Sequence, residues 1–298
     1  MLPHFFVVGA QKAASTSLHR YLRQHPDIYL PVQKESKFFV MDQFYERGLD
    51  YYEQEYFSLW KEEKAVGEVD PDIMFFEHAQ DRMARHLDIS ACRFIFIFRN
   101  PVERAFSHYL MTYRRGLENL SFEDAIAEEP KRMHGGFDAQ LHYSYTSRGY
   151  YLRQVERFLS RVDRKQTYYL LTDDLLQDPV GALRRLFSFL DVEPSFIPSR
   201  LERRYHKATV FRNRRLTRLI MGPSIFKNIF QKSLPNQKIR NRIYRMLLSA
   251  SLTSRHGIIM GEETREALFE LYRGENRRLE HFLGRSLDIW RGNPRCKS

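Results

Sequence analysis

The sequence contains few cysteines and no long hydrophobic run, and both absences limit what the protein can be. Only two of the 298 residues are cysteines, Cys92 and Cys296. Two cysteines make neither the disulfide framework of a small secreted domain nor a zinc site, so we expect a reducing compartment. The sequence has no stretch of about 18 apolar residues, which argues against a membrane-spanning helix.

The N-terminus also lacks the features of a secretory signal peptide. It has no basic segment, and its first apolar run is too short. We therefore predict a cytoplasmic protein, or one whose leader segment has been removed. The chain shows no internal repeat and no low-complexity tract, so its length fits one large or two small globular domains.

Positive charge is in excess over negative charge. The chain has 48 lysines and arginines against 37 acidic residues, a net charge of +11. Such an excess predicts an anionic partner, namely a nucleotide, a nucleic acid, a sulfated or uronic glycan, or a lipid headgroup. The alternative interpretation is that the charge serves solubility alone.

Short apolar segments alternate with amphipathic helical patterns along the chain. The run RFIFIF at 93–98 is typical of a central parallel strand that is covered on both faces. Further strands are predicted at 5–8, 65–69 and 167–171, and helices at 15–24, 77–86, 101–115, 149–160, 180–190 and 262–283. This alternation predicts an α/β fold of three layers with a central parallel sheet.

Residues 203–250 differ from the rest of the chain because they are basic and amphipathic. We predict a single domain over 1–298 with this segment as a helical elaboration. Lysine and arginine alternate with leucine, isoleucine and phenylalanine over 211–250, so contact with an anionic membrane surface is one expectation. The protein would then be peripheral at the membrane, and the contact would assist its main activity.

The first predicted strand, its loop and the following helix make an anion cradle. Gly9 ends the strand, Lys12 lies in the loop, and the hydroxyl residues Ser15, Thr16 and Ser17 begin the helix. The first N–H groups of a helix have no intrahelical partner, and the helix dipole favours negative charge there. We therefore predict a phosphate near residue 12, although an ordinary turn with an exposed lysine would give the same pattern.

The order of residues in this loop differs from that of common nucleoside triphosphatases. Their loop is GxxxxGK[ST], whereas here the lysine precedes the hydroxyl residues and no second glycine is present. The ligands of parallel α/β sheets bind beyond the carboxyl ends of the strands. The loops at 9–15 and 99–101 both leave such ends, so we expect them to face one ligand.

The loop QKAASTSL at 11–18 resembles the 5′-phosphosulfate loop of sulfotransferases that use 3′-phosphoadenosine 5′-phosphosulfate (PAPS). That loop runs roughly Pro-Lys-x-Gly-Thr-Thr-x-Leu, and here Gln11, Ala14 and Ser15 replace its proline, glycine and first threonine. The methyl group of Ala14 would crowd the phosphate or oppose a positive φ. The resemblance implies that the donor is bound by Lys12, Ala13, Ala14, Ser15, Thr16 and Ser17.

The segment FIFIFRNPVERAFSHYLMTYRRG at 94–116 resembles the 3′-phosphate element of the same family, a strand that ends in Arg-x-Pro and leads into a helix with a serine. The resemblance implies that Arg99 and Ser107 bind the 3′-phosphate. The forked donors of an arginine suit a phosphate group. Arg104 competes for this role, but we interpret it as a solvated charge on the helix.

The segment LPVQKESKFF at 30–39 resembles the Lys-Glu-x-x-Phe-Phe segment of heparan-type and bacterial carbohydrate sulfotransferases. The glutamate of that segment is the proposed catalytic base, which implies this role for Glu35. Lys34 and Lys37 flank it and either bind an anionic acceptor or hold Glu35 ionised. The alternative for Glu35 is an ion pair at the surface with these lysines.

A histidine base is the main mechanistic alternative to Glu35. His108 and His206 lie nearest the predicted site elements in the sequence, but neither is in a matching context. We interpret each of them as a partly exposed residue of a helix or loop.

The segment GEVDPDIMF at 67–75 resembles the family's Gly-Glu-Lys-[Ser/Thr]-Pro-x-Tyr segment, with Val69 and Asp70 in the lysine and hydroxyl positions. Glu68 is predicted either to face the acceptor or to serve as a structural carboxylate at the strand end.

Two later segments also resemble parts of the family. SRGYYLRQVERFL at 147–159 resembles its Gly-x-Tyr helix. HKATVFRNR at 206–214 resembles a basic loop that closes over the nucleotide, so Arg212 and Arg214 are candidates for binding the 3′-phosphate.

Together these segments identify a PAPS-dependent sulfotransferase of the carbohydrate branch, with a fold like that of the P-loop nucleoside triphosphatases. The sulfuryl group would pass in line to a hydroxyl, or in second place an amine, of a carbohydrate, glycolipid or metabolite. Lys12 would stabilise the leaving group, and no metal is expected because no carboxylates are spaced for one.

Two other functions stay open at this point. One is a nucleotide-dependent kinase of related fold. The other is a basic protein without enzymatic activity that binds a membrane or nucleic acid. For the sulfotransferase itself no nucleic-acid partner is expected.

Overall fold

The computed structural model of the chain describes residues 1–199, 201, 210–211, 252–253 and 258–291. The chain divides into two compact units, which are taken separately below. The first unit consists of Met1–Arg104, Arg148–Tyr205 and Glu270–Ser298, and the second of Ala105–Ser147 and His206–Phe269.

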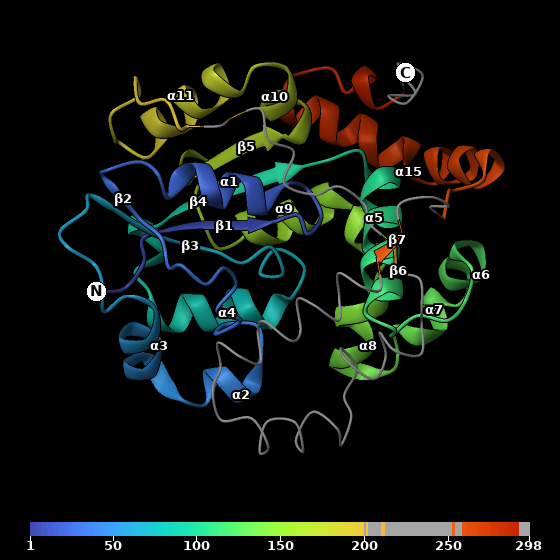
Figure 1. Cartoon of the computed structure of the whole chain (residues 1–298), viewed down its shortest axis with the longest axis horizontal. Helices are drawn as coiled ribbons and strands as arrows, with labels where there is room; N and C mark the ends of the chain where they lie inside the picture. The colour runs from blue at the N-terminus through green and yellow to red at the C-terminus, as the bar shows by residue number, and fades with distance from the viewer. Residues whose placement is uncertain (200, 202–209, 212–251, 254–257, 292–298) are drawn as a thin grey trace. The chain divides into compact units, whose positions relative to one another are not determined.

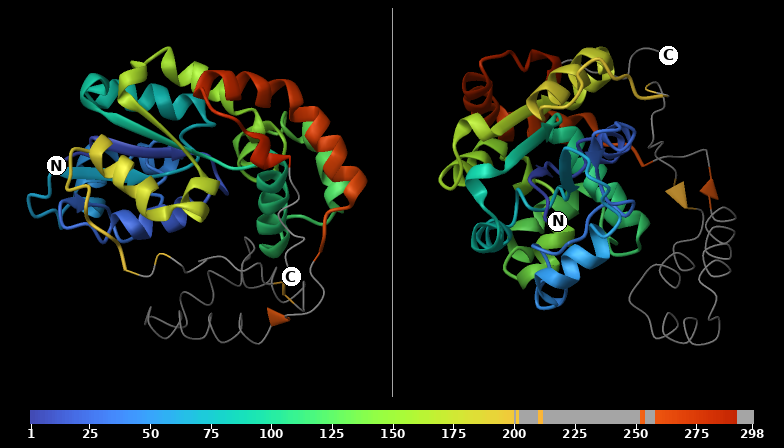
Figure 2. Two further views of the ribbon diagram at one scale, coloured as in Figure 1. Left: turned by 90° about the horizontal axis from the view of Figure 1, so that it is seen from above. Right: turned by 90° about the vertical axis from the view of Figure 1, so that its left-hand side faces the viewer.

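The first unit is built on a five-stranded parallel sheet with helices on both sides (Figure 1; Figure 2). Its strands are β1 (Phe5–Gly9), β2 (Ile28–Tyr29), β3 (Ala65–Val69), β4 (Arg93–Phe98) and β5 (Thr167–Leu171). The strand order β2-β3-β1-β4-β5 places β1 between β3 and β4. β3 thus lies on one side of β1 and β4 on the other. Because the strands are parallel, the loops that follow β1, β3 and β4 leave the same edge of the sheet.

The core of this sheet is aromatic and aliphatic. All five residues of β1 are buried, and in β4 only Arg93 is partly exposed. Phe6 stacks on Phe94, and Phe158 of α9 packs edge-on against Phe94 and Phe96. Strands buried on both faces are typical of a parallel sheet between two helical layers.

The helices of the first unit begin and end with ordinary signals. In α11, Pro179 stands at the first helical position, and the side chain of Asp178 accepts from the N–H of Gly181 at 2.8 Å. The α-helices that lie wholly in this unit are α1 (Ser15–Leu22), α2 (Asp42–Tyr45), α3 (Gly48–Tyr56), α4 (Glu77–His86), α9 (Tyr151–Leu159), α10 (Thr172–Gln177) and α11 (Pro179–Phe189). Two further helices, α5 (Pro101–Arg114) and α15 (Glu262–Leu283), have residues in both units.

The second unit holds the remaining α-helices and β-strands among the described residues. They are α6 (Phe122–Ala127), α7 (Glu129–Arg132), α8 (Gly136–Tyr143) and the antiparallel pair β6 (Val210–Phe211) and β7 (Leu252–Thr253). Its core contains two buried carboxylates. Glu118 pairs with Arg132 and accepts from the hydroxyl of Tyr145 at 2.9 Å, while Glu129 accepts from the N–H groups of Thr146 and Ser147.

The predicted α/β fold with a central parallel sheet is confirmed. Three of the four predicted strands have the predicted bounds, and the first extends by one residue to Gly9. The edge strand Ile28–Tyr29 was missed because two residues are too few to show an alternating pattern. The predicted basic elaboration at 203–250 lies outside the described residues apart from β6, and the prediction of a single domain stays a prediction.

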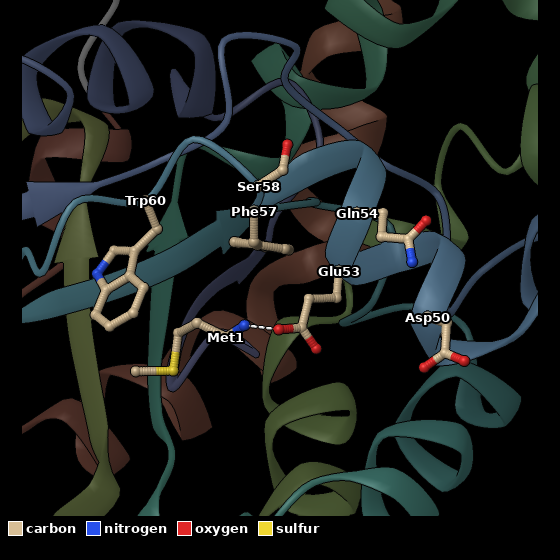
Figure 3. A pocket seen from close by; sticks show the side chains of 7 residues that line it. All are labelled: Met1, Asp50, Glu53, Gln54, Phe57, Ser58 and Trp60. Carbon is tan, nitrogen blue, oxygen red and sulfur yellow. Dashed lines mark ion pairs between the residues drawn. The ribbon is translucent and has the colours of Figure 1, made fainter.

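A shallow hollow of about 390 Å³ lies beside α3 (Figure 3). The amino group of Met1 pairs there with Glu53. The hollow lies toward the beginning of β1, whereas the predicted site loops leave its carboxyl end. Seven residues line the hollow: Met1, Asp50, Glu53, Gln54, Phe57, Ser58 and Trp60.

Within the described part of the chain, no helix combines the length and apolar character needed to cross a bilayer.

Gly67 tests the packing between β1 and β3. A Cβ atom at Gly67 would lie 2.3 Å from the Cζ atom of the fully buried Phe5 ring. We expect Gly67→Ala to lower the free energy of unfolding by about 1–3 kcal/mol, because overpacking displaces the ring. The matched control Gly274→Ala lies in α15 with nothing within 4 Å, and should raise stability by about 0.5–1 kcal/mol. Urea unfolding checks both, and equal stability of the two variants would contradict this account.

Candidate active site

The loop after β1 forms the predicted cradle at the carboxyl edge of the sheet. Its start is fixed to β4 because the N–H of Ala10 donates to the carbonyl of Ile97 at 2.7 Å. Its end is fixed by Thr172, whose hydroxyl lies 3.1 Å from the carbonyl oxygens of both Ala13 and Phe98. The loop is therefore held on both sides before α1 begins.

Ala14 adopts the left-handed backbone that its methyl group was expected to oppose. Its φ is 71°, and that of Lys12 is 69°. This conformation costs a residue with a side chain about 1–2 kcal/mol. The carbonyl of Ala14 accepts from the N–H groups of Ser17 and Leu18, so the helix begins here, and its first turn is not capped by a side chain. The start of α1 thus suits an anion.

Arg99 lies directly over this loop. Its guanidinium donates to the carbonyl of Lys12 at 3.2 Å and pairs with Glu103 at 3.7 Å, and 29% of its side chain is exposed. The hydroxyl of Tyr151 donates to the carbonyl of Arg99 at 2.8 Å and fixes the strand end. The structure therefore brings the two predicted phosphate elements together.

The roles of the other residues predicted for the 3′-phosphate stay predictions. Ser107 lies further along α5 in the second unit, and its role stays a prediction. Arg212 and Arg214 lie outside the described residues. The interpretation of Arg104 as a solvated helix charge is wrong, because this side chain is fully buried.

Glu35 lies between two ammonium groups. Lys34 pairs with one of its carboxylate oxygens, and Lys37 pairs with the other at 2.8 Å. Burial alone would raise the pKa of Glu35, but the charges of Lys37 and Lys34 outweigh it and lower the pKa below its ordinary value. Glu35 is thus an ionised carboxylate that is one third exposed.

Lys37 reaches from Glu35 to two buried aspartates at the end of β3. Its ammonium donates to Asp70 at 2.8 Å and also to Asp72. Burial opposes the charge of Lys37, but the three carboxylates outweigh it and raise the pKa of Lys37 well above its usual range. Asp72 also pairs with the buried Arg148, and the two cations hold the pKa of Asp72 far below its ordinary value despite its burial.

The fold gathers three carboxylates that the sequence did not show to be close. One oxygen from each of Glu35, Asp70 and Asp72 lies within 4.8 Å of the others. The ammonium of Lys37 contacts all three groups. A hard cation at this place would have to displace that ammonium, and the expectation of no metal stays a prediction.

Of the two roles predicted for Glu68, the one in which it faces the acceptor needs correction, because its side chain is not placed to contact an acceptor. Glu68 is 2% exposed, and its carboxylate oxygens accept from the N–H and hydroxyl of Ser36 and from the hydroxyl of Tyr52. Burial, and then the charge of Asp70, raise the pKa of Glu68 to about 7. Glu68 is therefore the structural carboxylate of the alternative, and it supports the segment that carries Glu35.

Several site residues were missed by sequence reasoning. Asp72 and Arg148 form a buried ion pair, Gln11 donates to Asp72 at 3.1 Å, and Thr172 fixes the loop. The pair Asp-x-Asp at 70–72 was visible in the sequence, but nothing there linked it to Arg148. Of the alternative histidine bases, His108 is fully buried in the second unit, so its interpretation as a partly exposed residue is wrong, and His206 lies outside the described residues.

In this parallel sheet the order of strand addition reverses at β1. The loop after β1 suits an anion, and Arg99 lies beside it. These features define an α/β protein of the phosphate-loop type. A model of the sulfotransferase domain family matches residues 2–241. The chain therefore belongs to the sulfotransferase family.

Known proteins with similar sequences are also sulfotransferases. Mouse heparan sulfate glucosamine 3-O-sulfotransferase 3A1 is 28% identical over 192 residues, which are 64% of this chain and 46% of that protein. The membrane-associated sulfotransferase kil1 of Dictyostelium discoideum is 30% identical over 136 residues, 43% of this chain and 28% of that protein. The chain thus spans less than half the length of these curated relatives.

A solved structure is similar over nearly the whole chain. The crystal structure of a sulfotransferase from Alicyclobacillus acidocaldarius has a TM-score of 0.70 and 27% sequence identity, and the match covers 98% of this chain and 100% of that one. The similarity supports the α/β fold described above for this family.

The raised pKa of Glu68 predicts a pH-dependent stability. The folded protein binds a proton at Glu68 up to about pH 7, whereas the unfolded chain loses it near 4.5. Stability from this group is therefore full below pH 4.5 and is lost as the pH rises through 7, by about 3 kcal/mol in total. We expect Glu68→Gln to abolish this decrease in urea unfolding between pH 5 and 8. The exposed control Glu55→Gln should retain it, and parallel curves for wild type and Glu68→Gln would contradict the prediction.

Proposed function

We propose that this sulfotransferase transfers the sulfuryl group of PAPS to a hydroxyl of a carbohydrate, glycolipid or small metabolite. The observation that carries the proposal is the contact between Arg99 and the main chain of Lys12. It joins the loop that resembles a 5′-phosphosulfate site to the arginine that resembles a 3′-phosphate ligand. A nucleotide with phosphates at both positions is the ligand that would use both.

The donor would lie across the carboxyl ends of β1 and β4. Its 5′-phosphosulfate would bind the loop and the start of α1 through Lys12, the N–H groups of residues 13–17 and the hydroxyls of that turn. Its 3′-phosphate would accept from Arg99, with Ser107, Arg212 and Arg214 as further candidates.

The transfer needs a base and a group that stabilises the leaving phosphate. The acceptor oxygen attacks sulfur in line, the bond from sulfur to the bridging phosphate oxygen breaks, and Glu35 takes the acceptor proton. Lys12 stabilises the charge that grows on the bridging oxygen. The products are the sulfated acceptor and 3′,5′-bisphosphoadenosine, and most of the catalytic effect comes from positioning.

A carbohydrate hydroxyl is the acceptor that the similarities favour. Several relatives are heparan sulfate glucosamine 3-O-sulfotransferases, and the segment around Glu35 resembles that branch. Lys34 and Lys37 both pair with carboxylates here, which favours their role in holding Glu35 ionised over binding of an anionic acceptor. Cytoplasmic localisation and membrane contact through 211–250 stay predictions.

Nucleotide selectivity tests the donor site. We expect calorimetry to show that 3′,5′-bisphosphoadenosine binds at least about tenfold more tightly than ATP, because only the former has a 3′-phosphate for Arg99. Arg99→Ala should weaken its binding by roughly 10–100-fold. The matched control Arg93→Ala, at the beginning of β4 and paired with Asp191, should bind normally. ATP binding that equals or exceeds bisphosphate binding would contradict the donor assignment.

Substitution of Glu35 tests the base. We expect Glu35→Gln to bind 3′,5′-bisphosphoadenosine normally and to lose transfer by about 100-fold or more, because the amide cannot accept the proton. Transfer is measured with radiolabelled donor against a panel of glycans, glycolipids and simple alcohols. Glu53→Gln, far along the chain on α3, serves as the control. Normal transfer by Glu35→Gln would exclude Glu35 as the base.

A further inference from the structure

Lys37 joins an exposed carboxylate to two buried ones. The side chain of Glu35 is 33% exposed, whereas those of Asp70 and Asp72 are 1% and 2% exposed. The single ammonium of Lys37 contacts all three groups. Lys34 also pairs with Glu35, but it contacts neither Asp70 nor Asp72.

The two buried aspartates form a fixed anchor. The N–H of Asp72 donates to the carboxylate of Asp70 at 3.1 Å, and Asp72 accepts in addition from Gln11 and the buried Arg148. Arg148 in turn lies 4.4 Å above the ring of Phe75. A lysine bonded to this anchor cannot change position without leaving buried charges unpaired.

The backbone of the same segment is held in an uncommon conformation. Glu35 and Lys37 have φ values of 68° and 59°, and Ser36 between them donates its N–H and its hydroxyl to Glu68. Left-handed backbone at residues other than glycine persists only where surrounding contacts impose it. The contacts of Ser36 with Glu68 and of Lys37 with the two aspartates are contacts of this kind.

We propose that Lys37 is a positioning residue that fixes the orientation and the charge of the catalytic base. This rests on the proposed function, in which Glu35 takes the proton of the acceptor. Through Lys37, the anchor of Asp70, Asp72 and Arg148 determines where the carboxylate of Glu35 points. Lys34 then adds a second positive charge at the other carboxylate oxygen of Glu35.

The balance of charge argues against the other predicted role of Lys37, which is to bind an anionic acceptor. Three carboxylates, those of Glu35, Asp70 and Asp72, face three cations, those of Lys34, Lys37 and Arg148. An anionic group of the acceptor would have to compete with buried carboxylates for an ammonium that is already neutralised. The two roles predict different kinetics.

The test compares Lys37→Met with the matched variant Lys34→Met. Loss of Lys37 removes the largest favourable charge at Glu35 and leaves the repulsion of Asp72, so the pKa of Glu35 rises. The acid limb of kcat should then move to higher pH by about one unit or more, and kcat near neutrality should fall at least about tenfold. Acceptor KM and the Kd of 3′,5′-bisphosphoadenosine should change less than about threefold. Lys34→Met should give a smaller shift, and Lys37→Arg should largely restore kcat.

A second variant distinguishes a loss of activity from a loss of folding. Lys37→Met alone leaves Asp70 and Asp72 buried beside Arg148 only, whereas Lys37→Met/Asp70→Asn keeps the summed charge of the cluster unchanged. We expect the double variant to unfold within a few degrees of wild type and still to show the lowered kcat. NMR titration of isotope-labelled glutamate side chains, with the Glu35 signal assigned by its loss in Glu35→Gln, measures the pKa without an acceptor.

The outcomes separate the two proposals. A raised acceptor KM with an unchanged pH profile would assign Lys37 to acceptor binding and overturn its positioning role. Wild-type kcat and pH profile in a folded double variant would also overturn the positioning role of Lys37. Normal transfer by Glu35→Gln would instead overturn the proposed base. Loss of transfer in Glu35→Gln, with no effect in the double variant, would leave the base in place and reject only the role of Lys37.

Discussion

The position of β1 between β3 and β4 is the constraint on which the site depends. Because all five strands are parallel, the loops after these three strands leave one edge of the sheet. The loop after β1 supplies Lys12, the loop after β4 supplies Arg99, and the end of β3 supplies Asp70 and Asp72. Lys12 and Arg99, which are 87 positions apart in the sequence, are thereby in hydrogen-bond contact.

In the proposed function, the site divides into a nucleotide half and an acceptor half that are built on different physical principles. The nucleotide half offers backbone N–H groups, a lysine and an arginine to an incoming anion. The acceptor half is internally compensated, since Lys34, Lys37 and Arg148 face Glu35, Asp70 and Asp72. The first is suited to hold phosphate, and the second to hold one carboxylate in a fixed place. Sulfuryl transfer requires both properties next to each other.

Local patterns in the sequence were sufficient for the sheet and for the residues at strand ends. Apolar runs predicted β3, β4 and β5 with their bounds, and Lys12 and Arg99 followed from the motifs that leave β1 and β4. The nonlocal features were not predictable in this way. The burial of Glu68 and Arg104 depends on packing between segments, and the pairing of Arg148 with Asp72 joins residues 76 positions apart. The left-handed conformation of Ala14 overrides its local preference because the loop is held at both ends.

The central claim is that the loops after β1 and β4 together hold one nucleotide with phosphates at its 3′ and 5′ positions. A crystal structure of the protein with 3′,5′-bisphosphoadenosine tests it most directly. The account predicts the 5′-phosphate at the start of α1, in contact with Lys12 and the N–H groups of residues 13–17, and the 3′-phosphate within hydrogen-bond distance of Arg99. A nucleotide bound elsewhere, or one whose 3′-phosphate does not contact Arg99, would contradict it.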